Sequence, residues 1–285
     1  MAMEKLSSII IKMKTPITYY GGKQGLADEI IKMIPAHKID CEPFFGGGAV
    51  FFRKPKSYLE VINDIDDRLI NFYQVAQTHF EQLHALVQQT FNSERQYLVA
   101  KDIWNDRLPA SKVEQAWAVW LITNGSFAGN MHGGWKWSNG TAGSHTGVYI
   151  KNKRNTFNAE LSDRLQTVQI SCRDAIKVIR ERDTPETIFY IDPPYPGSYQ
   201  GHYTGYTHAD LYELLQTLSV IKGKFILSNY WSQTLRYHIA RYGWQCKTIE
   251  VTIKVSNLGV CDGAKPKTRT EILVWNFAQP KDLFS

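Results

Sequence analysis

Hydrophobic positions change their spacing twice along the chain. Residues 26–34 place apolar side chains at helical intervals, and short apolar runs then end near Glu42 and over 58–62. From 67 to about 124 the helical spacing continues without a strand signal. Serine followed three residues later by Gln or Glu, at 93–96 and 111–114, predicts two helix starts within this stretch.

Strand and helix patterns alternate again after residue 162. Strands are predicted at 168–170, 188–191, 225–227, 248–255 and 271–277, with helices at 174–182, from 207 onward and at 235–242. Alternation at both ends predicts an α/β fold whose open sheet is assembled from both ends of the chain. We expect three parts: 1–67, a mostly helical insert at 68–161, and 162–285.

Composition and charge are those of a globular protein with a mild basic excess. Of 285 residues, 43% are hydrophobic and 13% aromatic, which excludes disordered and fibrous classes. The net charge of +6 favours a polyanionic partner. No apolar run near the start is long enough for a signal sequence or a membrane span. The four cysteines lack disulfide or zinc spacing, so we expect a reduced, soluble, cytoplasmic protein without a metal.

The sequence Asp192-Pro193-Pro194-Tyr195 follows directly on a predicted buried strand. In open α/β sheets, ligands bind beyond the carboxyl ends of strands. The prolines remove two N–H donors, so the Asp192 carboxylate and the Pro193 carbonyl are expected to accept hydrogens from an amino group. Tyr195 offers a ring for stacking a base. This arrangement suits alkylation of an aromatic amine, although a Pro-rich turn is the alternative for an isolated motif.

A glycine-rich segment, 42–52, follows the first predicted strand, and we expect a helix after it. Glycine lets the backbone approach a ligand closely. The segment lacks the third glycine of a dinucleotide fingerprint and the lysine of a P-loop, so neither of those ligands is favoured. Asp64 follows the next strand, where an acidic side chain can accept ribose hydroxyls. The alternative is that Asp64 only ends the strand and that Asp66 caps the next helix.

Taken in order, these motifs resemble one family. Tyr-Gly-Gly-Lys at 20–23, the glycine segment at 42–52, Asn-Asp-Ile-Asp at 63–66, a central insert and Asp-Pro-Pro-Tyr at 192–195 are similar to the D12 class of adenine-N6 DNA methyltransferases, the Dam-like group. The resemblance implies a Rossmann-like sheet that binds S-adenosylmethionine, a helical target-recognition insert and methylation of a flipped adenine in double-stranded DNA. The family often has Trp-Ala at 19–20, where this chain has two tyrosines.

The resemblance also implies roles for individual residues. Asp192, Pro193 and Tyr195 form the expected catalytic set, with Tyr195 stacking on the extruded base. The expected cofactor contacts are Tyr19, Lys23, Glu42, Phe44, Gly46, Gly48, Asp64, Asp174 and Asp192. The segment 123–130 departs from the Gly-Phe-Asn-Gly-like sequence and nearby arginine that the family would have there. This departure leaves the DNA sequence that is recognised open.

Positive charge is concentrated in two acid-poor stretches. Residues 115–159 contain no Asp or Glu, and residues 254–269 contain only Asp262. The first stretch includes seven glycines between 125 and 147, which predicts a long loop that could follow a phosphate backbone. The alternative is a surface loop whose tryptophans fold onto the core. The expected DNA contacts are Asn130, Trp135, Lys136, Lys151, Lys153, Arg154, Lys265 and Lys267.

Two other activities compete with adenine methylation. Methylation of cytosine N4 or of a protein glutamine side chain would use similar chemistry, but related enzymes usually carry Ser or Asn where this chain has Asp192. A DNA-binding or cofactor-sensing protein that keeps the fold without catalysis is the other alternative. We expect a monomer in a bacterial or phage setting, with a separate cognate restriction endonuclease as a candidate partner.

Overall fold

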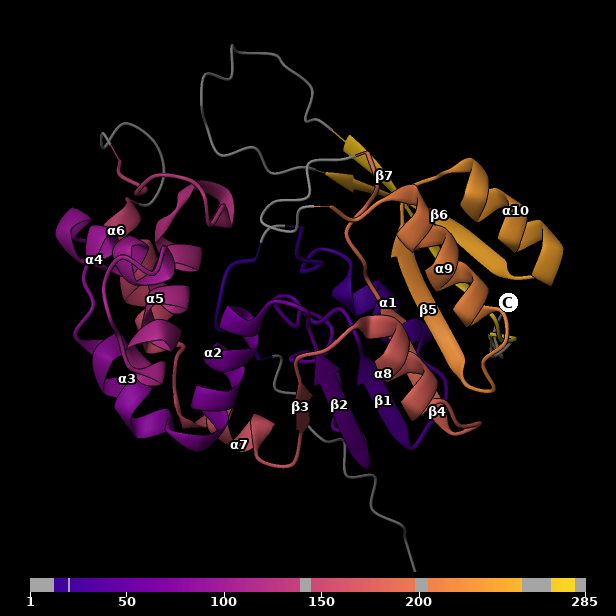
Figure 1. Cartoon of the computed structure of the whole chain (residues 1–285), viewed down its shortest axis with the longest axis horizontal. Helices are drawn as coiled ribbons and strands as arrows, with labels where there is room; N and C mark the ends of the chain where they lie inside the picture. Colours follow the sequence, from indigo (N-terminus) through magenta and orange to yellow (C-terminus); the bar gives the residue numbers. More distant parts are fainter. Residues whose placement is uncertain (1–12, 20, 139–144, 198–204, 253–267, 280–285) are drawn as a thin grey trace, which may run out of the picture.

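The computed structural model describes residues 13–19, 21–138, 145–197, 205–252 and 268–279. In this part of the chain, seven strands form one sheet in the order β3-β2-β1-β4-β5-β7-β6 (Figure 1). The strands are β1 Ile39–Glu42, β2 Leu59–Asn63, β3 Gln169–Ser171, β4 Thr187–Ile191, β5 Lys224–Asn229, β6 Gln245–Thr252 and β7 Thr268–Trp275. The helices are α1 Ala27–Met33, α2 Asp67–Thr78, α3 Phe80–Gln88, α4 Glu94–Trp104, α5 Lys112–Gly125, α6 Thr146–Asn155, α7 Ala159–Leu165, α8 Ala175–Arg182, α9 His208–Leu218 and α10 Gln233–Tyr242, with a short 3-10 turn at Phe127–Gly129.

Strands β1 to β5 pair in parallel, and β7 is antiparallel to both of its neighbours. Ile39 of β1 lies opposite Leu59 of β2 on one side and Thr187 of β4 on the other. On the far side, β7 is inserted between β5 and β6. The carboxyl ends of β1, β2 and β4 therefore meet at one edge of the sheet, where a ligand site is expected.

Both faces of the central strands are covered, as the continuous burial of β4 requires. Phe189 and Ile191 pack with residues of α8 and α9, while Ile188 and Tyr190 on the opposite face pack with residues of α1. A strand that is apolar on both faces reads as a continuous hydrophobic run, which explains why β4 is easy to predict from sequence.

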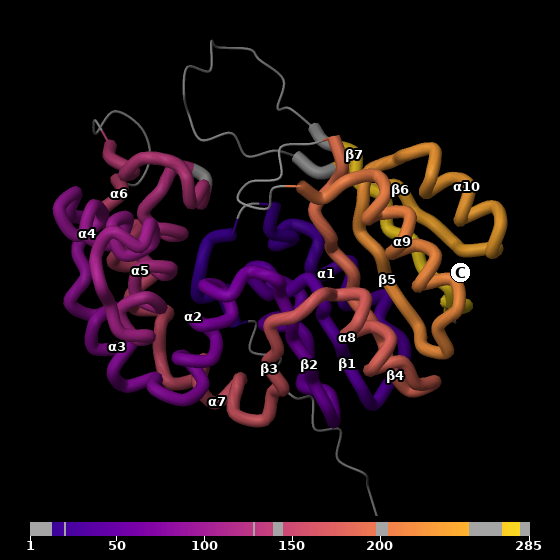
Figure 2. The backbone as a smooth tube through the Cα atoms, in the orientation of Figure 1, coloured from indigo at the N-terminus to yellow at the C-terminus, as the bar shows by residue number. Residues whose placement is uncertain are grey.

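The helices α2 to α7 form a separate layer beside β3 (Figure 2). The chain leaves the sheet after β2, passes through these helices and returns at β3, which pairs in parallel with β2. Trp120 of α5 is fully buried at the centre of this layer, edge-on to Phe157. The predicted helical insert is therefore the crossover between two neighbouring strands.

Several local predictions differ from the structure. Residues 43–58 form turns where a helix was expected after the glycine segment. Helices α6 and α7 were not predicted, because α6 buries only Thr146 and Ile150 and so lacks a long apolar stripe. Strand β6 begins at Gln245, three residues earlier than predicted, because its first residues are polar and exposed at the edge of the sheet.

Both predicted helix starts are present, but only one of them has a complete capping box. Ser111 accepts a hydrogen bond from the Glu114 backbone N–H, and Glu114 accepts one from the Ser111 N–H, which makes a complete capping box. Ser93 accepts from the Gln96 N–H, but the Gln96 side chain accepts from Phe91 instead. Both serines nevertheless begin their helices as expected.

No helix in the described ranges combines the length and apolar character needed to cross a bilayer. Cys41, Cys172 and Cys246 are free thiols, and Cys261 lies outside the described residues.

A buried ionic cluster joins the helical layer to the amino-terminal half of the sheet. Arg164 of α7 donates to both carboxylate oxygens of Glu60 on β2, one at 2.8 Å, and to the Phe51 carbonyl at 3.0 Å. Lys54 lies 2.5 Å from Glu60 and 3.4 Å from Asp40 of β1. Charges removed from water are tolerated only when they are paired and hydrogen-bonded, so each member of this cluster depends on the others.

Replacing Arg164 with Met should lower the free energy of unfolding by about 3 kcal/mol, because it leaves part of the buried Glu60 charge uncompensated. Urea denaturation followed by circular dichroism would measure the change. Lys38→Met is the matched control, since Lys38 forms an exposed ion pair with Glu186 and should have no measurable effect. An Arg164→Met protein as stable as wild type would show that the cluster contributes no net stability.

Candidate functional site

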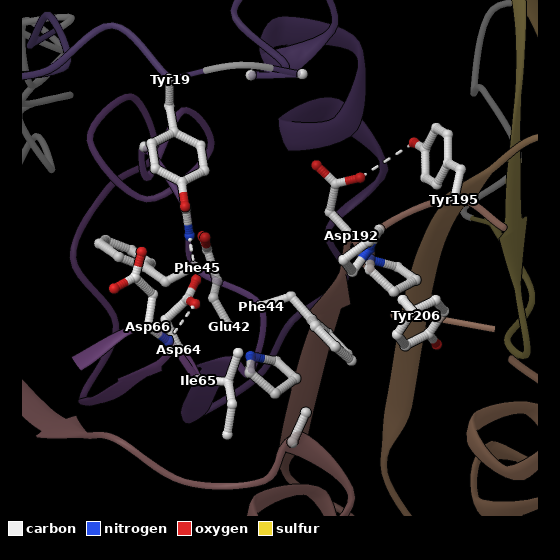
Figure 3. Close-up of a pocket in the computed structure, with 18 of the residues that line it drawn as sticks. Tyr19, Glu42, Phe44, Phe45, Asp64, Ile65, Asp66, Asp192, Tyr195 and Tyr206 are labelled. Atoms are coloured by element: carbon white, nitrogen blue, oxygen red, sulfur yellow. Dashed lines mark hydrogen bonds between the residues drawn. The ribbon is translucent and has the colours of Figure 1, made fainter. Parts of the chain in front are cut away.

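One large cavity lies where β1, β2 and β4 end. Its volume is about 840 Å³, and segments from both halves of the chain line it. All residues expected to bind the cofactor or to act in catalysis lie on its wall: Tyr19, Lys23, Glu42, Phe44, Gly46, Gly48, Asp64, Asp174, Asp192, Pro193 and Tyr195. Figure 3 shows Tyr19, Glu42, Asp64 and Asp66 on one side of the cavity and Asp192 and Tyr195 on the other.

The glycine segment after β1 depends on two positive backbone angles. Gly46 has φ of 51° and Gly48 has φ of 64°, a region that side chains with a Cβ rarely adopt. A Cβ on Gly48 would also lie 2.6 Å from the Phe45 ring. At Gly46 a Cβ would meet the Tyr19 ring at 3.1 Å. The segment is therefore folded tightly against Tyr19, with its backbone on the cavity wall.

A single amide, Asn63 at the end of β2, links the loops that follow β1 and β3. Its Nδ2 donates to the carbonyls of Pro43 at 3.0 Å and Arg173 at 2.9 Å. Its Oδ1 accepts from the Ser171 hydroxyl at 2.8 Å and the Arg173 N–H at 3.0 Å. Every donor and acceptor position of this buried side chain is used, which fixes the relative positions of three loops.

Asp64 and Asp66 have different roles. Asp64 accepts from the Gly46 N–H at 2.9 Å and from the Asp66 N–H at 3.1 Å, so it holds the glycine segment against the end of β2. Asp66 accepts from the N–H groups of Arg68 and Leu69 and so caps α2. The capping role considered for Asp66 is confirmed, whereas Asp64 does more than end a strand.

Glu42 presents a buried acceptor at the cavity. It is 1% exposed, and its Oε1 has no hydrogen-bond partner in the described part of the chain. Burial, followed by the nearby charge of Asp40, raises the pKa of Glu42 well above its usual range. An unsatisfied buried carboxyl on a cavity wall fits a ligand that brings its own donor, such as an amine or a hydroxyl.

Asp174 lies after β3 and caps α8 by accepting from the Lys177 N–H at 3.0 Å. The capping oxygen is Oδ1, and the residue also lines the cavity. Asp174 thus caps a helix, a structural role that the family resemblance did not imply.

Asp192 is held by Lys23 and Tyr195. The Lys23 Nζ lies 2.9 Å from Asp192 Oδ1, and the Tyr195 hydroxyl donates to the same oxygen at 3.1 Å (Figure 3). Burial raises the pKa of Asp192, and the positive charge of Lys23 opposes the shift while Glu271 adds to it. The carboxylate is therefore a strong acceptor whose charge is partly balanced by one lysine.

Tyr195, which is expected to stack on the extruded base, lines the cavity next to Asp192. The residue is 8% exposed, and its ring packs edge-on against Tyr230 at 4.4 Å between centroids. Lys23 lies over the ring at 4.9 Å. The Tyr195 hydroxyl therefore helps to hold Asp192, and stacking of its ring on a base stays a prediction.

The expected DNA contacts divide into several groups. Lys151 on α6 is exposed, and Asn130 is partly exposed in the loop that follows α5. Lys265 and Lys267 lie outside the described residues. The remaining four, Trp135, Lys136, Lys153 and Arg154, contact other residues of the protein.

Four of the residues expected to contact DNA are partly buried and contact other parts of the protein. Arg154 donates to the Gln88 carbonyl at 3.0 Å, and Lys153 donates to the Thr15 carbonyl at 3.3 Å. Burial lowers the pKa of Lys153 to about 8, which weakens it as a phosphate ligand. Trp135 donates to Asn92 at 3.2 Å, and Lys136 lies over the Tyr149 ring at 4.5 Å. The alternative, a loop whose tryptophans fold onto the core, fits Trp135 but not Trp137, which is 59% exposed. A DNA contact by any of these four residues stays a prediction.

Several cavity residues were not predicted from the sequence. Arg68, Trp104 and His132 of the helical layer line the cavity, with the Arg68 guanidinium 4.8 Å from the Trp104 ring centre. Asn63 belongs to the Asn-Asp-Ile-Asp sequence at 63–66. Its position next to Asp64 could have indicated a role at the site. Ser228 and Glu271 do not line the cavity but reach the Asp192 region from β5 and β7; strands were predicted at both places, but no role was assigned to either residue.

The cavity suits a ligand with several polar groups and a hydrophobic part. A glycine backbone, two acidic side chains and the rings of Tyr19 and Phe44 line one end, while the Asp192 carboxylate stands at the other. In the described ranges, no group of three or more metal-binding side chains is present. The site therefore provides acceptors and aromatic surface for chemistry on an amine.

Comparison with known proteins gives matches over most of the chain. A family model described as D12 class N6 adenine-specific DNA methyltransferase matches residues 19–252. Type II methyltransferase M1.LlaDCHI of Lactococcus lactis subsp. cremoris is 27% identical, and the match covers 96% of this chain and 99% of that protein. DNA adenine methylase of Vibrio cholerae is 27% identical over 68% of this chain and 70% of its own.

A shorter match has higher identity. DNA N-6-adenine-methyltransferase of Escherichia phage P1 is 36% identical over 92 residues, which is 31% of this chain and only 12% of the phage protein.

Gly48→Ala should lower the free energy of unfolding by about 2 kcal/mol, because the new methyl group meets Phe45 while the backbone keeps a positive φ. Chemical denaturation would measure the loss. Gly134→Ala is the control, since a Cβ there meets no atom within 4 Å. Equal stability of the two variants would contradict the close packing described for this segment.

Proposed function

The chain belongs to the D12 class N6 adenine-specific DNA methyltransferase family, and we propose that it methylates the exocyclic N6 of an adenine at a specific site in double-stranded DNA. The cofactor is S-adenosylmethionine. The observation that carries the proposal is the arrangement of one cavity, in which Asp192 and Asp64 lie on opposite sides (Figure 3) and Pro193 and the glycine segment also form part of the wall. Asp192, rather than Ser or Asn, favours adenine over cytosine N4 or glutamine as the acceptor.

The residues present fit this cofactor. The Glu42 Oε1 atom lacks a partner in the described chain and can accept from an amine or hydroxyl of the ligand. Asp64 and the backbone at Gly46 and Gly48 would hold the polar part, with Tyr19 and Phe44 beside it. When bound, S-adenosylmethionine supplies an electrophilic methyl group.

Asp192 and Pro193 act on the amine. The lone pair of an adenine amino group is delocalised into the ring, so the nitrogen is a poor nucleophile. Two acceptors, the Asp192 carboxylate and the Pro193 carbonyl, would each take one hydrogen bond and favour a tetrahedral nitrogen. Both described contacts of the Asp192 carboxylate fall on Oδ1, so Oδ2 is the oxygen assigned to the amine.

We assign target recognition to the helical insert and the loop after it, residues 68–161. The exposed position of Lys151 supports a backbone contact there. The protein is proposed to act as a monomer on DNA in the cytoplasm of a bacterium or of a phage-infected cell. Since one relative is named a type II methyltransferase, a separate restriction endonuclease is the proposed partner.

Incubating the purified protein with unmethylated DNA and methyl-labelled S-adenosylmethionine tests the activity. Label recovered as N6-methyladenine supports the proposal, and label in another base or in protein contradicts it. Cofactor binding without transfer to any DNA would point to the non-catalytic alternative. Sequencing genomic DNA from expressing cells, with detection of modified bases, would identify the recognition sequence.

Asp192→Ala should reduce transfer by a factor of at least about 1,000 while DNA binding changes little, because the acceptor for the amine is lost. Asp163 of α7 is exposed, so Asp163→Ala is the control and should keep full activity. Filter binding and label transfer would be measured together. Retained turnover in Asp192→Ala, with DNA binding lost, would remove Asp192 from the catalytic role.

The same carboxylate predicts a pH dependence. Only ionised Asp192 accepts fully from the amine, and burial raises its pKa, with Glu271 adding to the shift. Turnover should therefore fall as the pH drops through this raised pKa, above the range of an exposed aspartate. A kcat profile that stays flat down to pH values near 4 would contradict this prediction.

Lys151→Ala should weaken binding to all DNA sequences by a similar factor and reduce the slope of log affinity against log salt by about 1, as expected for one lost phosphate contact. Fluorescence anisotropy at several salt concentrations measures the slope. Lys38→Ala removes the same charge just before β1, at the other end of the strands, and should leave the slope unchanged. Identical slopes for both variants would exclude Lys151 from the interface.

A further inference from the structure

Behind Asp192 lies a second buried carboxylate, Glu271 of β7. It is 1% exposed and does not line the cavity. Its Oε2 accepts from the Ser228 hydroxyl at 3.3 Å and lies 3.8 Å from the Lys23 Nζ. A fully buried carboxylate is costly unless it is paired, so its position next to the reactive turn needs a role beyond packing.

Glu271 reaches Asp192 by two routes. In the first, Lys23 stands between the two carboxylates, 2.9 Å from Asp192 Oδ1 and 3.8 Å from Glu271 Oε2. In the second, Ser228 lies 3.0 Å from the Tyr195 hydroxyl, which donates to Asp192 Oδ1 at 3.1 Å. The two routes start at the same oxygen of Glu271 and end at the same oxygen of Asp192. Because the Ser228 and Tyr195 hydroxyls carry one hydrogen each, they donate in two of the three contacts of the second route at a time.

We propose that Glu271, together with Ser228, is a positioning residue for Asp192. It anchors both Lys23 and Tyr195 from behind, so that these two groups occupy Oδ1 while Oδ2 stays directed to the amine. The inference rests on the proposed function, because the orientation of Asp192 matters only if its carboxylate accepts from a substrate.

Lys23 lies between Glu271 and Asp192. Lys23 contacts both carboxylates, so its charge does not fully neutralise Asp192. Among the described residues, the titratable groups that face Asp192 are Lys23 before α1, Tyr190 on β4, Tyr195, and Glu271 on β7. After burial, the negative charge of Glu271 is one of the causes that raise the pKa of Asp192. Removing that charge should make Asp192 easier to ionise.

The test compares Glu271→Gln and Ser228→Ala with wild type. Both variants should lower kcat at least about fivefold at neutral pH, with KM for DNA changed less than about twofold, because the acceptor is misplaced but the binding surfaces remain. In Glu271→Gln the acidic limb of the kcat profile should move to lower pH. The double variant should lose less than the product of the two single losses, since both residues act through one chain of contacts.

Exposed Glu250 on the neighbouring strand β6 provides the charge-matched control, Glu250→Gln, and its profile should match wild type. The Kd for S-adenosylhomocysteine, measured by calorimetry, should stay within about threefold in every variant. Thermal unfolding checks that Glu271→Gln is folded, and Ser228→Ala tests the same chain with a smaller change.

Two outcomes would overturn the inference. One is a Glu271→Gln enzyme with unchanged kcat and acidic limb, and the other is a lower kcat accompanied only by lost stability or lost cofactor affinity. These results differ from a failure of the proposed function, in which the wild-type protein itself transfers no methyl group to DNA.

Discussion

The site depends on the hydrogen bonds of one buried amide, Asn63. Each of the loops after β1, β2 and β3 must turn away from the sheet, and each exposes backbone groups that need partners. Asn63 supplies two acceptor and two donor contacts to the loops on either side of it. Since Asp64 follows directly and binds the Gly46 N–H, the position of the glycine segment is determined by the same short stretch of β2.

Two buried groups of charged side chains, which differ in composition, lie in and around the sheet. In the cluster of Arg164, Glu60, Lys54 and Asp40, two cations face two carboxylates, and the cluster ties α7 to the sheet. At the cavity, Lys23 faces both Asp192 and Glu271. The first cluster connects secondary-structure elements, whereas in the second a lysine contacts two carboxylates, of which Asp192 lines the cavity and can accept from a ligand.

The sequence predicted the parts of the structure that rest on local patterns. Buried β4 and amphipathic α9 could be identified because their apolar residues are continuous or periodic. The motifs around Gly46, Asp64 and Asp192 are likewise local, and all lie on the cavity wall. Helix α6 escaped prediction because its contacts, including those of Lys153 and Arg154, are made to distant segments.

Long-range partners explain the remaining differences. Charge and composition predict DNA contacts for Lys153, Arg154 and Trp135, but they do not reveal the partly buried hydrogen bonds that these side chains make to Thr15, Gln88 and Asn92. The roles of Ser228 and Glu271 were not predicted for the same reason, because these residues come close to Asp192 only after β5 and β7 have joined the sheet. A pattern within ten residues contains no information about such pairings.

The insertion of the helical layer between β2 and β3 affects how the protein can fold. Asn63 and Ser171 are 108 residues apart in sequence but share a hydrogen bond, and Lys23 meets Glu271 from the opposite end of the chain. To form such contacts, the chain must lose much of its conformational entropy before the energy of the contacts offsets this loss. This requirement slows folding. During synthesis the helices can pack first, but the reactive centre can assemble only after β7 has left the ribosome.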